Sequence, residues 1–227
     1  MMTNRKPLTR QDMKRLVLPH IEGLEQMSFG RLCDIMEREA VRQGIDCVNW
    51  REYPYCPIVS FDAAYSDRYL FVRFFVRGLG VKAAYCNDND PVWQDSCVEL
   101  FVATPDGNGY FNFEMNCIGA LLAAKRKSRK ESVEHFDAAG LSRVVRHSTF
   151  ERRAFAEREG ICEWSVAMGI PFDLLGYPEG VRPSVLRGNL YKCADETAVP
   201  HYVSWNPIDT PAPDFHRPEF FGELILG

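Results

Sequence analysis

The chain has 227 residues, of which 46% are hydrophobic and 26% are charged, and its formal net charge is −4. This length fits one large β domain or two small ones, and the apolar content is enough for a substantial core. A slightly acidic chain has no electrostatic basis for binding nucleic acid or an anionic membrane surface. The sequence also lacks a run of about 20 apolar residues that could span a bilayer.

Residues 1–27 are mixed and poorly periodic, and we expect an extended or partly helical arm. The arm has basic residues but no apolar stretch or cleavage site of a signal peptide. We therefore expect a cytoplasmic protein, or a secreted one if a leader precedes this chain. Residues 28–43 place apolar side chains near helical spacing between a Ser28 N-cap and Gly44, which predicts a short helix.

From residue 46 onward, about ten short segments rich in β-branched and aromatic residues alternate with turn residues. This spacing predicts an all-β fold, a two-sheet β-sandwich or jelly roll, with one helical insertion at residues 128–139. We expect the arm and helix, residues 1–44, to pack on a single domain formed by residues 45–227.

The segment 88–116 predicts two strands joined by a Gly-rich turn. On the second strand, Phe111 and Phe113 point to one face while Asn112 and Glu114 point to the other. On the first strand, Glu99 lies in an otherwise apolar row. The polar face fits a strand face exposed to water. It also fits a sugar site, which needs polar groups for hydroxyls and a flat ring for the pyranose.

Three motifs add a family resemblance: WQDSCVELF at residues 93–101, YFNFE at 110–114, and the C-terminal run at 200–226, which contains Ser204, Trp205, Phe215, Pro218, Phe221 and Gly222. Together they resemble the family 9 carbohydrate-binding modules and their wider DOMON-like relatives, over about residues 45–227. The resemblance implies a non-catalytic β-sandwich domain that binds a mono- or oligosaccharide.

The resemblance also implies roles for particular residues. Trp93 would stack on the sugar as one aromatic wall, and Phe215, with His216 beside it, would occupy the position of the other. Glu99 matches the sugar-binding carboxylate. From the residues alone, Trp93 could be a rim residue, Phe215 a loop anchor in the core, and Glu99 the partner of an arginine such as Arg73.

Several positions depart from the family pattern. Phe215 stands where the family usually has Trp, and it offers less stacking area and no N–H donor. Asn112 stands where the family has an arginine, and Glu114 where it has an asparagine. Tyr191 falls where the family presents another polar contact, although it also fits a half-buried strand tyrosine. These changes predict weak binding or a different sugar.

Two other functions remain open. Glu99 and Glu114 on adjacent strands could serve a glycoside hydrolase, which needs two carboxyl groups at a defined separation. A DOMON-like module could instead hold a haem or another redox cofactor, for which Met115 and His201 are the conceivable ligands. Trp205 and the YPYCP segment at residues 53–57 are interpreted as architecture.

The chain has eight cysteines without CxxC spacing and without an accompanying histidine cluster. We therefore predict no zinc site and mostly reduced thiols, with Cys97, Cys117 and Cys162 in the core. No cofactor is expected, although the acidic loop at Asp88 and Asp90 would be the place for a structural calcium ion. The sequence leaves the oligomeric state open.

Overall fold

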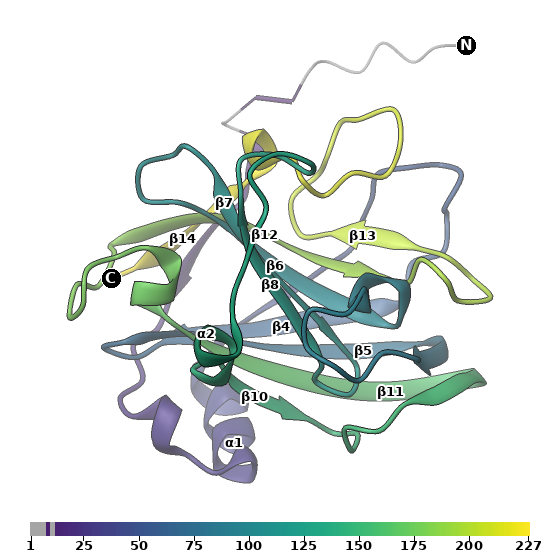
Figure 1. Ribbon diagram of the computed structural model, residues 1–227, viewed down its shortest axis with the longest axis horizontal. Coiled ribbons are helices and arrows are strands. Elements are labelled where there is room, and N and C mark those ends of the chain that lie inside the picture. Colours follow the sequence, from purple (N-terminus) through teal and green to yellow (C-terminus); the bar gives the residue numbers. More distant parts are fainter. Residues whose placement is uncertain (1–7, 10–11) are drawn as a thin grey trace.

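In a computed structural model, which describes residues 8–9 and 12–227, the chain forms two packed β-sheets (Figure 1). The larger sheet contains, in spatial order, β1 (Arg15–Leu18), β14 (Gly222–Leu226), β12 (Val185–Cys193), β6 (Cys97–Ala103), β7 (Tyr110–Asn116), β8 (Leu121–Arg126) and β9 (Glu134–His135), with β13 (Tyr202–Ser204) paired to β12 and β3 (Cys47–Val48) to β13. The smaller sheet contains β10 (Val145–Ser148), β11 (Phe155–Pro171), β5 (Tyr69–Ala83), β4 (Ile58–Tyr65) and β2 (Val41–Gly44). The expected β-sandwich is confirmed.

The main core lies between the two sheets and follows from strand alternation. Phe113 of β7 points inward with Phe111 and Met115, as the sequence predicts. Phe61 of β4 meets Trp205 edge to face across the core, with ring centroids 5.9 Å apart. Trp205 is fully buried, which supports its interpretation as architecture. Each buried side chain of this size stabilises the fold by about 1.5–3 kcal/mol.

The outer face of the smaller sheet is covered by helix α1 (Phe29–Glu39), seen beside β10 in Figure 1. Leu32 and Met36, one helical turn apart, pack in a cluster with Phe71 of β5. This packing explains the amphipathic spacing of the helix. The outer face of the larger sheet carries a second, aromatic-rich cluster, on which the pocket described below is built.

The predicted helix over 28–43 is too long. The helix ends at Glu39, and Val41–Gly44 forms β2, an edge strand in which Val41 pairs with Ala63 of β4. Sheet pairing supplies hydrogen bonds to a segment that begins with the β-branched Val41 and ends with Gly44, both weak helix formers. The part of the predicted N-terminal arm at residues 1–7 and 10–11 lies outside the described residues.

The helical insertion expected at 128–139 is also displaced. Residues 128–133 form turns and bends, Glu134–His135 forms β9, and helix α2 spans Ala138–Ser142. Asp137 begins this helix because its carboxylate accepts a hydrogen bond from the Gly140 amide at 2.8 Å. The segment before β9 carries Arg129 and Lys130 to the neighbouring pocket.

All eight cysteines are free thiols in the structure. Cys97 and Cys117 are buried as predicted, whereas Cys162 is only partly buried. Among the described residues, no helix is long and apolar enough to cross a membrane.

Candidate functional site

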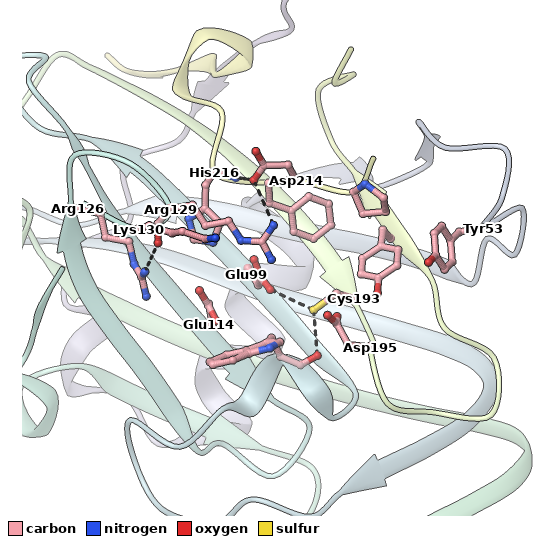
Figure 2. Close-up of a pocket in the computed structure, with 14 residues that line it drawn as sticks. Tyr53, Glu99, Glu114, Arg126, Arg129, Lys130, Cys193, Asp195, Asp214 and His216 are labelled. Carbon is pink, nitrogen blue, oxygen red and sulfur yellow. Dashed lines mark hydrogen bonds and ion pairs between the residues drawn. The ribbon is translucent and has the colours of Figure 1, made fainter. Parts of the chain in front are cut away.

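An open pocket with a volume of about 450 Å³ lies on the outer face of the larger sheet. Figure 2 shows Glu99 and Glu114 at its centre, with Arg126, Arg129 and Lys130 on one side and Tyr53, Cys193 and Asp195 on the other. Four aromatic side chains also line it: Tyr53, Trp93, Tyr202 and Phe215. Of the residues expected at a sugar site, the structure brings Trp93, Glu99, Glu114, Phe215 and His216 to this pocket.

Trp93 is held at the pocket by the residues that follow it. It lies in a single 3-10 turn, Val92–Gln94. The fully buried Asp95 follows this turn directly. The Asp95 carboxylate accepts hydrogen bonds from the amides of Ala84 and Tyr85 at 2.8 and 3.0 Å. The carboxylate therefore ties the turn to the end of β5 and leaves the indole ring partly exposed at the pocket.

A continuous row of aromatic rings forms a second wall. Tyr53 meets Tyr202 edge to face at 4.8 Å, and Tyr202 in turn meets Phe215 at 6.2 Å between ring centroids. Phe215 is only 8% exposed, so the core-anchor alternative is partly correct, but the residue still lines the pocket. The interpretation of Tyr53 as architecture alone is incomplete, because its ring lines the pocket too.

Tyr191 does not contact the pocket, contrary to the expectation. It is fully buried on β12, and its ring stacks on Phe215 with centroids 4.2 Å apart. Its hydroxyl donates a hydrogen bond to the Phe215 carbonyl oxygen at 3.1 Å. Tyr191 therefore positions Phe215.

His216 lines the pocket as an uncharged ring. Its Nδ1 atom is hydrogen-bonded to the Tyr110 hydroxyl at 2.8 Å. Burial and the nearby charges of Arg126 and Arg129 lower the pKa of His216 to about 3. At neutral pH the imidazole is neutral, so it offers ordinary hydrogen bonds to a ligand and no charge.

Two carboxyl groups lie side by side at the pocket floor. Glu99 of β6 and Glu114 of β7 are directly opposed in the sheet register, and they are 3% and 4% exposed. Burial and mutual repulsion raise the pKa of Glu99 well above its usual range. Burial likewise raises the pKa of Glu114 to about 7, despite the nearby Arg126. The pair therefore offers both hydrogen-bond donors and acceptors near neutral pH.

Asn112 is fully buried, and the structure does not bring it to the lining of the pocket. Its amide nitrogen donates to Glu114 Oε1 at 2.9 Å, and its carbonyl oxygen accepts from Arg126 Nε at 2.8 Å. Asn112 therefore bridges the Glu114 carboxyl and the Arg126 guanidinium, which both line the pocket. The guanidinium that the family resemblance would put at position 112 comes instead from Arg126 on the neighbouring strand.

The basic side of the pocket is formed by β8 and the loop after it. The Arg126 guanidinium donates from Nη1 to the Arg129 carbonyl oxygen at 3.0 Å, which ties the loop to the strand. Arg129 lies 4.0 Å from the Asp214 carboxylate. The opposite side carries Asp195, whose pKa burial raises to about 6. The pocket is therefore polarised, with cations facing carboxyl groups across its width.

Glu99 is not the partner of Arg73, which removes one alternative. The Arg73 guanidinium belongs to the smaller sheet and lies 3.9 Å from Glu37 of α1. Glu99 Oε1 instead accepts a hydrogen bond from the Cys193 thiol at 3.1 Å.

The residues considered as ligands of a haem or of a calcium ion are poorly placed to bind either one. Met115 is buried in the core between the sheets, whereas His201 lines a separate small pocket and donates from Nδ1 to the Val199 carbonyl oxygen. They do not share a cavity that could hold a haem. Asp88, the expected calcium ligand, already binds Arg146 at 2.7 Å as well as Arg152. Burial acts to raise the pKa of Asp88, but the Arg146 and Leu121 hydrogen bonds hold it below its usual value.

Sequence reasoning missed part of the site, chiefly Tyr53, Arg126, Arg129, Asp195 and Tyr202. Arg126 is the residue that a pattern argument could have found. It is the last residue of an apolar strand that pairs with the strand of Glu114, and residues two apart share a face. The loop residues carry no such periodicity.

Known proteins resemble this chain in sequence and in fold. The sequence model of carbohydrate-binding family 9 matches residues 32–226. The chain therefore belongs to carbohydrate-binding family 9, which confirms the expectation of a carbohydrate-binding domain. A search among curated proteins found no match.

Solved structures agree with this family assignment. A candidate carbohydrate-binding protein from Bacteroides uniformis is 34% identical, with a TM-score of 0.88 over 94% of this chain and 99% of that one. A family 9 module from Caldicellulosiruptor kristjanssonii, solved with glucose, is 13% identical, with a TM-score of 0.63 over 94% of this chain and 96% of that one. The same kind of module was also solved with cellotriose, at 13% identity and a TM-score of 0.63, over 94% of this chain and 93% of that one.

Proposed function

We propose that this domain binds a mono- or oligosaccharide in the pocket on its larger sheet and does not cleave it. The observation that carries the proposal is the convergence of aromatic rings and carboxyl groups on one open cavity. Rings offer a flat apolar surface to a pyranose, and carboxyl groups accept or donate hydrogen bonds to its hydroxyls. The glucose and cellotriose complexes of a family 9 module support the ligand class.

The ring of the sugar would lie against Trp93, with Phe215 and Tyr202 on the opposing wall. Glu99 and Glu114 would bind hydroxyls from the floor, and Arg126 would add charged donors from the side. Charge-assisted hydrogen bonds are about twice as strong as neutral ones. Arg126 would thereby donate hydrogen bonds to sugar hydroxyls that the buried Asn112 cannot contact.

The arrangement of the two glutamates favours binding over hydrolysis. A glycosidase places its carboxyl groups on either side of the bond that breaks. Glu99 and Glu114 are directly opposed neighbours on one face of one sheet, so their side chains leave the sheet in the same direction. They would both contact the same side of a sugar resting on the floor.

The proposal is tested by calorimetry with glucose and with cellotriose as ligands. We expect a dissociation constant of about 1 mM, close to −4 kcal/mol, because the pocket is open to water. Trp93→Ala should abolish the binding heat. Phe220→Ala is the matched control, since Phe220 is an aromatic residue outside the pocket and should leave the binding heat unchanged.

A glycan array with the same two variants extends the test to other sugars. If wild-type protein binds no glycan on the array, or if Trp93→Ala binds as well as wild type, this pocket is not a sugar site.

A further inference from the structure

The pocket floor contains a cluster of three side chains, of which the sugar-binding proposal uses only Glu99. Cys97 of β6 and Cys193 of β12 are directly opposed in the antiparallel register, and Glu99 lies two residues from Cys97 on the same face. All three are buried. One ligand atom from each, two thiol sulfurs and a carboxyl oxygen, lies within 4.8 Å of the others.

We propose that Cys97, Cys193 and Glu99 bind one thiophilic divalent cation of the zinc class. The metal site shares Glu99 with the proposed sugar site, but its existence does not require that a sugar binds. Thiolate sulfur and carboxylate oxygen are both ordinary zinc ligands, and a site with three protein ligands leaves a fourth position for a water molecule.

The dimensions of the cluster suit tetrahedral coordination. With zinc–sulfur and zinc–oxygen distances of about 2.3 and 2.0 Å, ligand atoms in a tetrahedral site stand about 3.5–3.8 Å apart. Cys193 Sγ and Glu99 Oε1 are 3.1 Å apart, and the whole cluster falls within 4.8 Å. Metal binding therefore requires only small side-chain movements on two paired strands.

The charge surrounding the cluster also suits a cation bound by three anions. Two thiolates, one carboxylate and a divalent cation leave one net negative charge. Lys192, between Cys193 and Tyr191 on β12, is buried, and its ammonium group donates only to the Cys193 carbonyl oxygen among the described hydrogen bonds. The Lys192 side chain leaves β12 on the face opposite Cys193 and lies 5.9 Å from the Trp164 ring in the core, so it would oppose the charge of the loaded site only through the sheet.

The cluster is accessible from solvent. Cys193 and Glu99 both line the open pocket, whereas Cys97 lies behind them. A cation would enter through the pocket, and the fourth coordination position would face its interior. Each ligand binds in its deprotonated form, so the two thiols each release a proton to solvent, and the Glu99 carboxyl releases one wherever it is protonated.

The experiment uses the reduced full chain, freed of metal with a chelator and kept reduced by a phosphine. Cd²⁺ and Co²⁺ are titrated separately, because thiolate ligation produces a charge-transfer absorption band and tetrahedral Co²⁺ produces visible bands. We expect one ion per chain and a thiolate band at saturation. Proton release, followed with a pH indicator in weak buffer, should lie between two and three per ion.

Variants assign the ligands. Cys97→Ser and Cys193→Ser should each reduce the thiolate band and weaken binding by about tenfold or more. Glu99→Gln should weaken binding while both thiolates still contribute to the band. Cys56→Ser is the matched control, because Cys56 is exposed and not part of the cluster, and it should bind as wild type does.

A reduced wild-type chain that shows no charge-transfer band overturns the proposal. A band that survives the Cys97→Ser/Cys193→Ser double variant, or that disappears in Cys56→Ser, overturns it as well. If circular dichroism shows that the serine variants do not fold, Glu99→Gln decides instead. A metal affinity equal to that of wild type would then overturn the proposal. Sugar binding is measured separately, so the two proposals can fail independently.

Discussion

Tyr191 supports Phe215 from below, with the two rings stacked at 4.2 Å between centroids and 10° between planes. The Tyr191 hydroxyl also holds the Phe215 backbone through its carbonyl oxygen. A loop residue is thereby fixed to a central strand of the sheet. Phe215 therefore lines the pocket, whereas Tyr191 lies behind it and determines its position.

Replacing Tyr191 should therefore weaken sugar binding without removing a contact to the sugar. Tyr191→Leu loses both the stacking and the hydrogen bond, and we expect binding to weaken by about tenfold, or about 1.4 kcal/mol. Tyr191→Phe keeps the stacking and should lose less. Calorimetry with cellotriose checks the order. Equal binding by Tyr191→Leu and wild type would contradict the positioning role.

Tyr53 and Tyr55 form a matched pair, two residues apart in one loop. Only Tyr53 lines the large pocket, whereas the Tyr55 hydroxyl accepts a hydrogen bond from the Leu79 amide at 2.7 Å. Tyr53→Ala should weaken sugar binding, while Tyr55→Ala should leave affinity unchanged and lower stability by about 1 kcal/mol. Calorimetry and urea unfolding separate the two effects. A loss of affinity in Tyr55→Ala alone would reverse this assignment.

Glu114→Gln should change how stability depends on pH. Burial raises the pKa of Glu114 in the folded chain to about 7. A raised folded pKa contributes stability at low pH, and that contribution is lost as pH rises through 7. Glutamine has no proton to lose, so wild type should become less stable relative to Glu114→Gln between pH 5 and pH 8. Urea unfolding at both pH values measures this difference, which should be absent for an exposed change such as Glu131→Gln.

His201→Gln should show the opposite dependence. Burial and the nearby Lys192 lower the pKa of His201 to about 3. A lowered folded pKa contributes stability above the unfolded value of about 6.5, and that contribution is lost as pH falls. From pH 7.5 to pH 5, wild type should lose about 2 kcal/mol relative to the glutamine variant. A difference that does not vary over this range would mean that the fold does not lower the pKa of His201.

The strand pattern allowed much of this protein to be predicted. Strict alternation along residues 110–116 places Phe113 in the core and Glu114 on the opposite face, because successive strand residues point to opposite sides. The same rule put Glu99 on the face of the pocket. Helix ends were less predictable, since Val41 joined a sheet edge that local spacing does not reveal.

Contacts between distant segments were decided only by the tertiary structure. Cys97 and Cys193 are far apart in sequence, and their spacing indicated no metal site, yet β6 and β12 pair so that the two face each other. Arg129 and Tyr53 come from loops that carry no periodic signal. Local sequence determines which face of a strand a side chain takes, because backbone geometry repeats every two residues. Which strands become neighbours depends on the packing of the whole chain, and that packing assembled the pocket.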